Sequence, residues 1–434
     1  MRLAFIIERR NYYRTFATAV DAALKRGWRV DCWHDWAQPP AAAPNLRARA
    51  KRWIAGRWPG LERAASDKSS EFPNSAPLFH CGTPRVLIYH GKTELLQRLA
   101  ESPPDAVFAA WPPPSDLVPR IPWITLQHMM NLLYLGPKGL AAFDHVACSS
   151  RYWLDRSLDY FRRLGELQEG DSELATAIAK RYTAVGVPEL DQTSLIDPAS
   201  VRARLGLDAD KPVVLYLPYP RKSNPQTFWV KHVYGTKGRL WGLAAVLATG
   251  RHGYWRHVVR GWNDAGAADA LRAFCDANDA LLIVKSRRKD PVSRHTAERA
   301  DRVLYDESYY PATILELLSI ASLCVHFFSS TAYEALFLGV PSLCVTPSAE
   351  DMGLPPVWME LLNNTREGGV FNFPGASYHL SLPELVEDLP RRSLKDFPVE
   401  PAARARFLET FVGFDDTRSS ERLLDLVAGR RETP

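Results

Sequence analysis

Short apolar runs rich in branched residues alternate along the chain with stretches whose apolar residues recur at helical spacing. In the first half, a helix is expected from Thr15 to Lys25, ended by Gly27. Strands are expected at 2–7, 28–32, 85–89, 106–110, 123–126 and 145–148. Strands that alternate with helices indicate a parallel sheet with both faces covered.

The same alternation resumes after a polar stretch that ends at Asp210. Strands are expected at 211–217, 280–285, 323–327 and 341–345, and helices at 267–278, 313–321 and 331–338. We therefore predict an N-terminal domain over 1–195, a linker over 196–210, a C-terminal domain over 211–401 and a helical segment over 402–434 that packs back toward the first domain. Two doubly wound α/β domains would place a ligand in a cleft between them, against the carboxyl ends of the strands.

Composition narrows the protein class. The 434 residues are 46% hydrophobic and 24% charged, which excludes a disordered or fibrous chain. A net charge of +5 is small for this length and argues against a nucleic-acid binder. The six cysteines form no CxxC pair and are expected to be reduced core residues. The apolar stretch at the N-terminus is too short for a signal peptide and no run spans a membrane, so a cytoplasmic location is expected.

The segment 325–341 is the most informative for chemistry. A buried strand ends near His326, Ser329 and Ser330 supply hydroxyls where a helix begins, and Glu334 lies one turn into that helix. Backbone N–H groups and hydroxyls at such a turn bind phosphate, and a carboxylate accepts hydrogen bonds from a ribose diol. The alternative is a capping box, with Ser330 or Thr331 answered by Glu334.

Two further stretches fit the same ligand. Lys285, Arg287 and Arg288 follow a strand and could balance a diphosphate without a metal ion, although a solvated basic loop is the alternative. Tyr310, in the aromatic-rich loop 303–311, could stack a nucleobase, although it could equally be ordinary packing. The Asp208–Asp210 pair lies in a polar turn and is not expected to bind metal.

Taken together, these motifs resemble the C-terminal half of GT-B glycosyltransferases, in particular the CDP-glycerol glycerophosphotransferases and the capsule-polysaccharide transferases that use CMP-Kdo. The matching positions are Lys285 with Arg287-Arg288 and Pro291, Tyr310-Pro311 with Glu316-Leu317-Leu318, and His326 with Ser329, Ser330 and Glu334. The family's histidine in the first motif is absent, and Arg287 occupies its approximate place. The segment 407–422 resembles the family's closing helix.

In the N-terminal half, Gln127 and His128 end a strand in a pattern similar to the acceptor-side domain of these enzymes. The resemblance implies that His128 accepts the proton of the acceptor hydroxyl, although a lone histidine is more often structural. Glu8, beside Arg9 and Arg10 at the end of the first strand, is the rival base.

The resemblance implies a bacterial transferase that moves a sugar or polyol phosphate from a nucleotide-activated donor to a glycan or lipid-linked acceptor, with no metal or other cofactor. The alternatives are an epimerase of the UDP-GlcNAc 2-epimerase type and a non-catalytic glycan- or nucleotide-binding protein. The basic segment Arg47–Leu61, which carries Trp53 and Trp58, could dock the protein peripherally on an anionic membrane; an exposed loop is the alternative.

Overall fold

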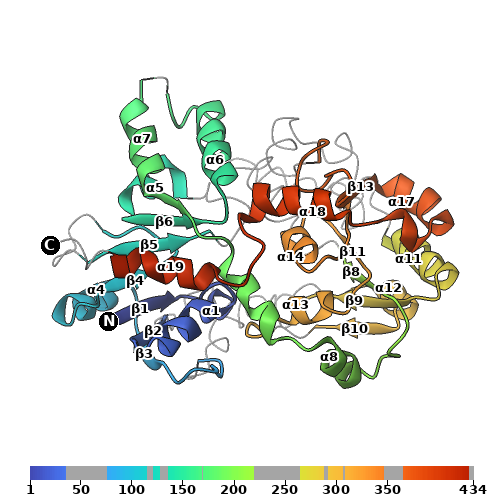
Figure 1. Cartoon of the computed structure of the whole chain (residues 1–434), viewed down its shortest axis with the longest axis horizontal. Helices are drawn as coiled ribbons and strands as arrows, with labels where there is room; N and C mark the ends of the chain where they lie inside the picture. The colour runs from blue at the N-terminus through green and yellow to red at the C-terminus, as the bar shows by residue number, and fades with distance from the viewer. Residues whose placement is uncertain are drawn as a thin grey trace, which may run out of the picture. The chain divides into compact units, whose positions relative to one another are not determined.

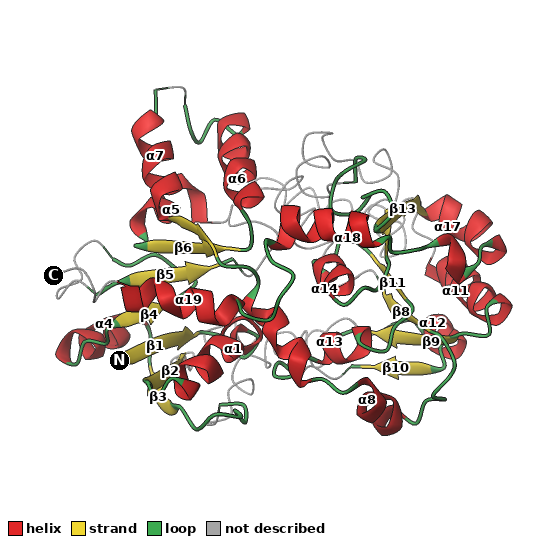
Figure 2. Ribbon diagram, in the orientation of Figure 1, coloured by secondary structure: helices red, strands yellow, loops and turns green. Residues whose placement is uncertain are grey.

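The computed structural model describes residues 1–35, 76–114, 121–127, 135–168, 170–218, 264–287, 292–305, 308–346 and 365–429. The chain divides into two compact units (Figure 1). Unit 1 comprises Met1–Leu195, Ser308–Ala312 and Glu409–Pro434, and unit 2 comprises Ile196–Glu307 and Thr313–Leu408. Each unit is a parallel sheet with helices packed on it (Figure 2).

Within the described residues, the sheet of unit 1 has seven strands in the order β3-β2-β1-β4-β5-β6-β7, all paired in parallel. The strands are β1 Arg2–Ile7, β2 Arg29–Asp35, β3 Arg85–Tyr89, β4 Ala106–Phe108, β5 Trp123–Leu126, β6 His145–Cys148 and β7 Tyr182–Ala184. The strand order reverses direction between β1 and β4. In open α/β sheets, ligands bind outside the carboxyl ends of the strands at such a switch point.

The helices of unit 1 come from both ends of the chain. They are α1 Tyr12–Lys25, α4 Lys92–Glu101, α5 Gly136–Ala142, α6 Arg151–Arg163, α7 Ser172–Arg181, the 3-10 helix η2 Pro188–Leu195 and α19 Ser419–Ala428. Helix α19 lies against α1 (Figure 1), and Leu423 and Leu424 join Phe5 and Phe16 in one buried cluster. The last helix therefore completes the core of the first unit.

Unit 2 repeats the same topology. Its described sheet has the order β10-β9-β8-β11-β12-β13, again all parallel, and its switch point lies between β8 and β11. The strands are β8 Val213–Leu217, β9 Leu281–Lys285, β10 Arg302–Leu304, β11 Leu323–His326, β12 Ser342–Thr346 and β13 Ser377–Ser381. The helices are α8 Pro198–Leu205, α11 Asp264–Ala277, α12 Arg294–Arg299, α13 Thr313–Leu318, α14 Thr331–Phe337, α17 Leu382–Asp388 and α18 Pro401–Phe407.

The domain boundaries differ from the predicted ones in three places. The short stretch Ser308–Ala312, expected in the C-terminal domain, belongs to unit 1. The stretch 196–210, expected as a linker, belongs to unit 2 and contains α8. Asp197 caps that helix by accepting from the backbone N–H groups of Ala199 and Ser200, and Gly206 ends it in the left-handed conformation. The closing segment 402–434 also divides, because α18 lies in unit 2 and the residues from Glu409 onward lie in unit 1.

All six cysteines, each within the described part of the chain, are free thiols, and only Cys81 among them is exposed. No helix among the described residues is both long enough and apolar enough to cross a bilayer.

Candidate functional site

The turn after β11 is fixed from inside by His326. This residue is inaccessible to solvent, and its Nε2 lies 2.8 Å from the hydroxyl of Ser342 on the neighbouring strand. Its Nδ1 accepts from the backbone N–H of Ser329 at 3.3 Å. Burial lowers the pKa of His326 to about 3, so the ring is neutral. The imidazole therefore anchors the turn within the protein, with both nitrogens already bonded.

The backbone reverses sharply at Phe328, whose φ of 46° lies in the left-handed region that a bulky residue rarely adopts. Such a conformation persists only where the surroundings hold it. The ring of Phe328 packs edge-on against Phe371, which also contacts the ring of His326. The strain at this turn presents the following serines at the start of α14.

The two serines of the turn have different roles. The Ser329 hydroxyl donates to Thr331 Oγ1 at 2.8 Å and accepts from the Thr331 backbone N–H at 3.2 Å. Ser330 is partly exposed and makes no side-chain cap bond to the helix within the described region. Glu334 lies one turn further on and is 5% exposed. The capping box weighed from the sequence is thus not formed, and the Ser330 hydroxyl is not committed to the helix.

The basic motif lies at the same edge of the sheet. Lys285 ends β9, and its ammonium donates to the carbonyl of Ser286 at 3.0 Å. Arg287 follows and is exposed. Because β8 stands between β9 and β11, Lys285 and Arg287 share the carboxyl edge of the sheet with the turn after His326. Arg288 lies outside the described residues.

Tyr310 makes its described contacts within unit 1. It belongs to unit 1, where it is 8% exposed and its hydroxyl donates to Asp21 Oδ2 at 2.8 Å. Its ring packs 5.5 Å from that of Phe79 and 5.8 Å from that of His80. This is the ordinary packing that the sequence analysis gave as the alternative to stacking on a nucleobase, and a role in nucleotide binding stays a prediction.

A second polar group occupies the carboxyl edge of the unit 1 sheet. Glu8 directly follows β1, Asp35 ends β2 and Tyr89 ends β3, and the strand register sets Asp35 opposite Tyr89. Glu8 is partly buried, and burial raises its pKa; Asp35 raises it further, whereas Lys92 and the hydrogen bond from Tyr12 lower it. The net result for Glu8, the rival base of the sequence analysis, is a pKa above the ordinary glutamate value.

An aromatic residue borders this group. Trp111 lies just beyond β4, and the ammonium of Lys92 sits 4.1 Å from the centroid of its ring. Sequence reasoning did not single out Asp35, Tyr89, Lys92 or Trp111. The only available signal was that each lies within three residues of a strand end.

His128 lies outside the described residues, and its role as a base stays a prediction. Its neighbour Gln127 is described, and its Oε1 accepts from the backbone N–H of Ser149 at 3.1 Å. This bond ties the end of β5 to the chain that leaves β6.

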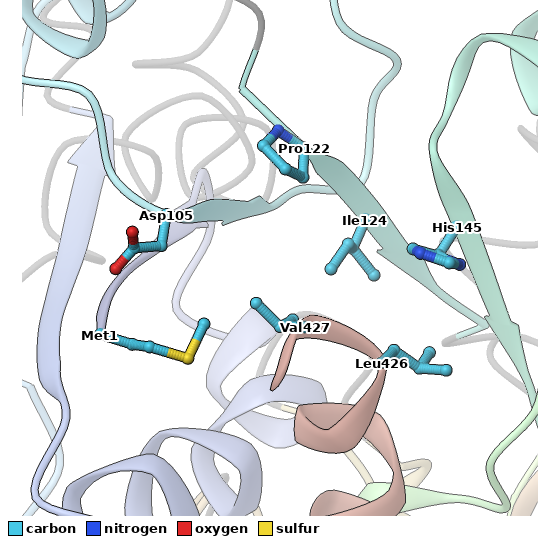
Figure 3. Close-up of a pocket in the computed structure, with 7 residues that line it drawn as sticks. All are labelled: Met1, Asp105, Pro122, Ile124, His145, Leu426 and Val427. Atoms are coloured by element: carbon cyan, nitrogen blue, oxygen red, sulfur yellow. The ribbon is translucent and has the colours of Figure 1, made fainter. Parts of the chain in front are cut away.

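The hollow in Figure 3 lies at the opposite edge of the same sheet. It is lined by Met1, Asp105, Pro122, Ile124, His145, Leu426 and Val427 and has a volume of about 70 Å³. Met1, Asp105 and Pro122 each precede a strand, so the hollow faces the amino ends. At roughly 30 Å³ per liquid water it is too small for a nucleotide or a sugar. No group of three or more potential metal-binding side chains occurs among the residues that the structure describes.

Comparison with known proteins bears on the fold. No protein-family model matches the chain, and no curated protein matches its sequence. Among solved structures, the wall teichoic acid polymerase TagF is 13% identical with a TM-score of 0.55, covering 99% of this chain and 88% of that chain. A Listeria monocytogenes protein assigned as a UDP-N-acetylglucosamine 2-epimerase is 11% identical with a TM-score of 0.53, covering 100% and 97%.

A structure of S. aureus MnaA with UDP is 10% identical with a TM-score of 0.52, covering 100% of this chain and 97% of that chain. At such identities the similarity establishes the fold alone. The predicted GT-B fold, with two doubly wound α/β units, is confirmed.

Proposed function

We propose that this GT-B protein is a transferase that takes a nucleotide-activated sugar or polyol phosphate and attaches it to a hydroxyl of a bacterial surface glycan or lipid-linked acceptor. The proposal rests mainly on one observation. A strained turn, anchored by His326, lies beside the switch point of the unit 2 sheet and leads into α14, which begins after Ser330 and contains Glu334. This is the position where doubly wound sheets bind nucleotides.

Unit 2 would hold the donor. The Ser330 hydroxyl, with the backbone of the turn, would donate to the phosphates, and Lys285 and Arg287 would offset the charge of the leaving nucleotide. Glu334 would accept hydrogen bonds from the ribose hydroxyls. His326 holds the turn in place and would not touch the nucleotide, because its nitrogens bond Ser342 and Ser329. Donor recognition in this scheme needs no divalent metal.

Unit 1 would hold the acceptor. The acceptor hydroxyl attacks the electrophilic centre of the donor, either the anomeric carbon of a sugar or the phosphorus that carries a polyol. The bond to the nucleotide oxygen breaks, the nucleotide leaves with the electron pair, and the hydroxyl proton passes to a base. Glu8 is the described candidate for that base, and His128 remains the alternative.

Support for a transferase also comes from the fold of TagF, a wall teichoic acid polymerase of which a structure was obtained after soaking with CDPG. The membrane part of the proposal rests on sequence alone. The basic segment Arg47–Leu61 lies outside the described residues, and we propose that it docks the protein peripherally on the cytoplasmic face of the membrane.

A second candidate function is epimerisation of a nucleotide sugar. Two observations favour it: the similarity to the Listeria monocytogenes protein over almost the full length of both chains, and the neighbouring carboxylates Glu8 and Asp35. Paired carboxylates can remove and return a proton at a sugar carbon. Such an enzyme acts on its nucleotide sugar without an acceptor.

The proposal is tested in two steps. A thermal-shift panel of CMP, CDP, UDP, GDP and ADP identifies the base, because a ligand that binds only the folded state raises the melting temperature. The corresponding nucleotide sugars or polyols are then incubated with and without an extract of glycan acceptors. Nucleotide release that depends on the acceptor supports the transferase; conversion without acceptor supports the epimerase; binding without turnover in either arm would indicate a binding protein.

A further inference from the structure

Lys92 occupies a position that its own helix does not favour. It is the first residue of α4, directly after the Gly91 cap, and the amino end of a helix carries partial positive charge. Acidic residues are stabilising there and cations are not, and Glu94 in the same turn follows that rule. A lysine at this point therefore has its favourable contacts outside the helix.

Those contacts lie across the carboxyl edge of the sheet. Lys92 follows β3, yet its ammonium sits 4.1 Å from the centroid of the Trp111 ring, which lies beyond β4. In the strand order β3-β2-β1-β4, two strands separate these positions. The charge of Lys92 also acts on Glu8, which directly follows β1, so the Lys92 side chain extends from the β3 side toward the ends of β2 and β1.

The charges around Glu8 oppose one another. Among the described groups that face it, Asp35 of β2 disfavours its ionised form, whereas Lys92 of α4, Arg9 and the hydroxyl of Tyr12 in α1 favour that form. Tyr89 of β3 is 1% exposed. Burial raises the pKa of its hydroxyl most, and the carboxylates of Asp35 and Glu8 raise it further. After burial itself, Lys92 has the largest effect on the pKa of Glu8, and it counteracts both burial and Asp35.

We propose that Lys92 is a positioning residue: held against Trp111, its ammonium keeps Glu8 ionised beside Asp35, so that Glu8 can accept the proton of the acceptor hydroxyl. The assignment of the proton acceptor rests on the proposed function. Burial raises the pKa of Glu8 most and Asp35 raises it further, whereas Lys92 lowers it. Burial and the opposing charges of Lys92 and Asp35 together determine the pKa at which Glu8 exchanges its proton.

The first test is the pH profile of acceptor-dependent turnover. Removing the ammonium with Lys92→Met should move the acid limb of kcat/KM to higher pH, on the order of half to one unit, because an opposite charge nearby favours the ionised form. Asp35→Asn should move the same limb to lower pH. Lys92→Arg should restore the wild-type limb. Lys138→Met, which removes an exposed lysine of α5, should leave it unchanged.

A role of Lys92 in folding alone would lower activity equally at every pH. Limbs that coincide for Lys92→Met and the wild type would overturn the proposal, as would shifts of the same sign for Lys92→Met and Asp35→Asn.

The second test does not depend on activity. The carboxyl carbon of Glu8 is titrated by NMR in protein labelled at glutamate side chains, with Glu8→Gln to assign the resonance. The Glu8 midpoint should rise in Lys92→Met and fall in Asp35→Asn. Unchanged midpoints would overturn the role of Lys92 and leave the transferase proposal standing. If the Glu8 midpoints shift as expected but the protein binds no nucleotide, the proposed transferase function is wrong, whereas the electrostatic effect of Lys92 on Glu8 stands.

Discussion

His326 and Ser342 join neighbouring strands of unit 2 through a contact of 2.8 Å between the imidazole Nε2 and the serine hydroxyl, and neither residue is accessible to solvent. The strand register pairs His326 with Cys344, so Ser342 lies two residues back along β12 on the same face of the sheet. The ring therefore spans from the neighbouring strand to the turn that carries the candidate donor site. This bridging role explains why the otherwise apolar strand β11 ends in a histidine.

The buried imidazole makes stability sensitive to acid. Burial lowers the pKa of His326 from 6.5 to about 3, so below pH 6.5 the unfolded chain binds a proton that the folded chain rejects. The neutral His326 therefore contributes to the free energy of unfolding above pH 6.5, and this contribution is lost as the pH falls toward 3. Between pH 7 and 5 this amounts to about 2 kcal/mol at ~1.4 kcal/mol per unit.

Urea unfolding at pH 7 and pH 5 measures this loss. The variant His326→Asn, which keeps an acceptor for the Ser329 N–H, should lose about 2 kcal/mol less than the wild type over that interval. His34, whose pKa burial lowers to about 4, contributes in the same direction and remains in both proteins. Equal losses in the two proteins would contradict the buried neutral state of His326.

Asp31 of β2 forms ion pairs with residues at the amino ends of the two neighbouring strands, β1 and β3. Its side chain is 3% exposed and accepts from Arg2 Nε at 2.7 Å and Arg85 Nε at 2.8 Å. Asp31→Asn should cost ~2 kcal/mol of unfolding free energy, less than the 3–5 kcal/mol of a fully buried pair, because both arginines can reach solvent. Asp155→Asn, which breaks an exposed pair on α6, is the control and should cost less than ~0.5 kcal/mol in the same urea titration.

Donor binding should be independent of divalent metal, because Lys285 and Arg287 offset the charge of the leaving group. Turnover measured in EDTA is expected to equal turnover in buffer alone. Activity that disappears in EDTA and returns with magnesium would count decisively against this scheme.

The basic segment Arg47–Leu61 should bind anionic lipid. Each basic residue near an anionic surface contributes about 1 kcal/mol, and the Debye length falls to ~3 Å at 1 M salt, so binding should weaken as salt rises. Liposome co-sedimentation with anionic and neutral lipid measures it. Equal binding to both lipids, or no loss when Arg47, Arg49, Lys51 and Arg52 are changed to Ser, would reduce the segment to an exposed loop.

The hydrophobic pattern predicted the strands that are buried along most of their length, because such strands appear in the sequence as continuous apolar runs. Strands such as β1 and β11 are buried along nearly their full length and were placed to within one residue. Strands β7 and β10 have three residues each and none of these is fully buried, whereas the equally short β4 is buried throughout and was predicted. Strand β13, Ser-Tyr-His-Leu-Ser, is largely polar and could not be recognised in this way.

The candidate site was predictable only where its signal is local. Ser330 and Glu334 lie within one turn of a helix, and their spacing is visible in the sequence. The partners of His326 and Tyr310, Ser342 and Asp21, are 16 and 289 residues away, so their inward roles depend on tertiary contacts. The approach of Lys92 to Trp111 likewise follows from the strand order, which the hydrophobic pattern does not fix.

Calorimetric titration of Glu334→Ala with the nucleotide that gives the largest thermal shift tests the central claim most directly. Loss of the carboxylate should cost ~1.5–3 kcal/mol of binding free energy, a Kd roughly 10- to 150-fold weaker, because two charge-assisted hydrogen bonds to the ribose disappear. Glu298→Ala, which removes an exposed carboxylate of α12, is the matched control and should bind as the wild type does. An unchanged Kd in folded Glu334→Ala protein would contradict the assignment of the donor site to this turn.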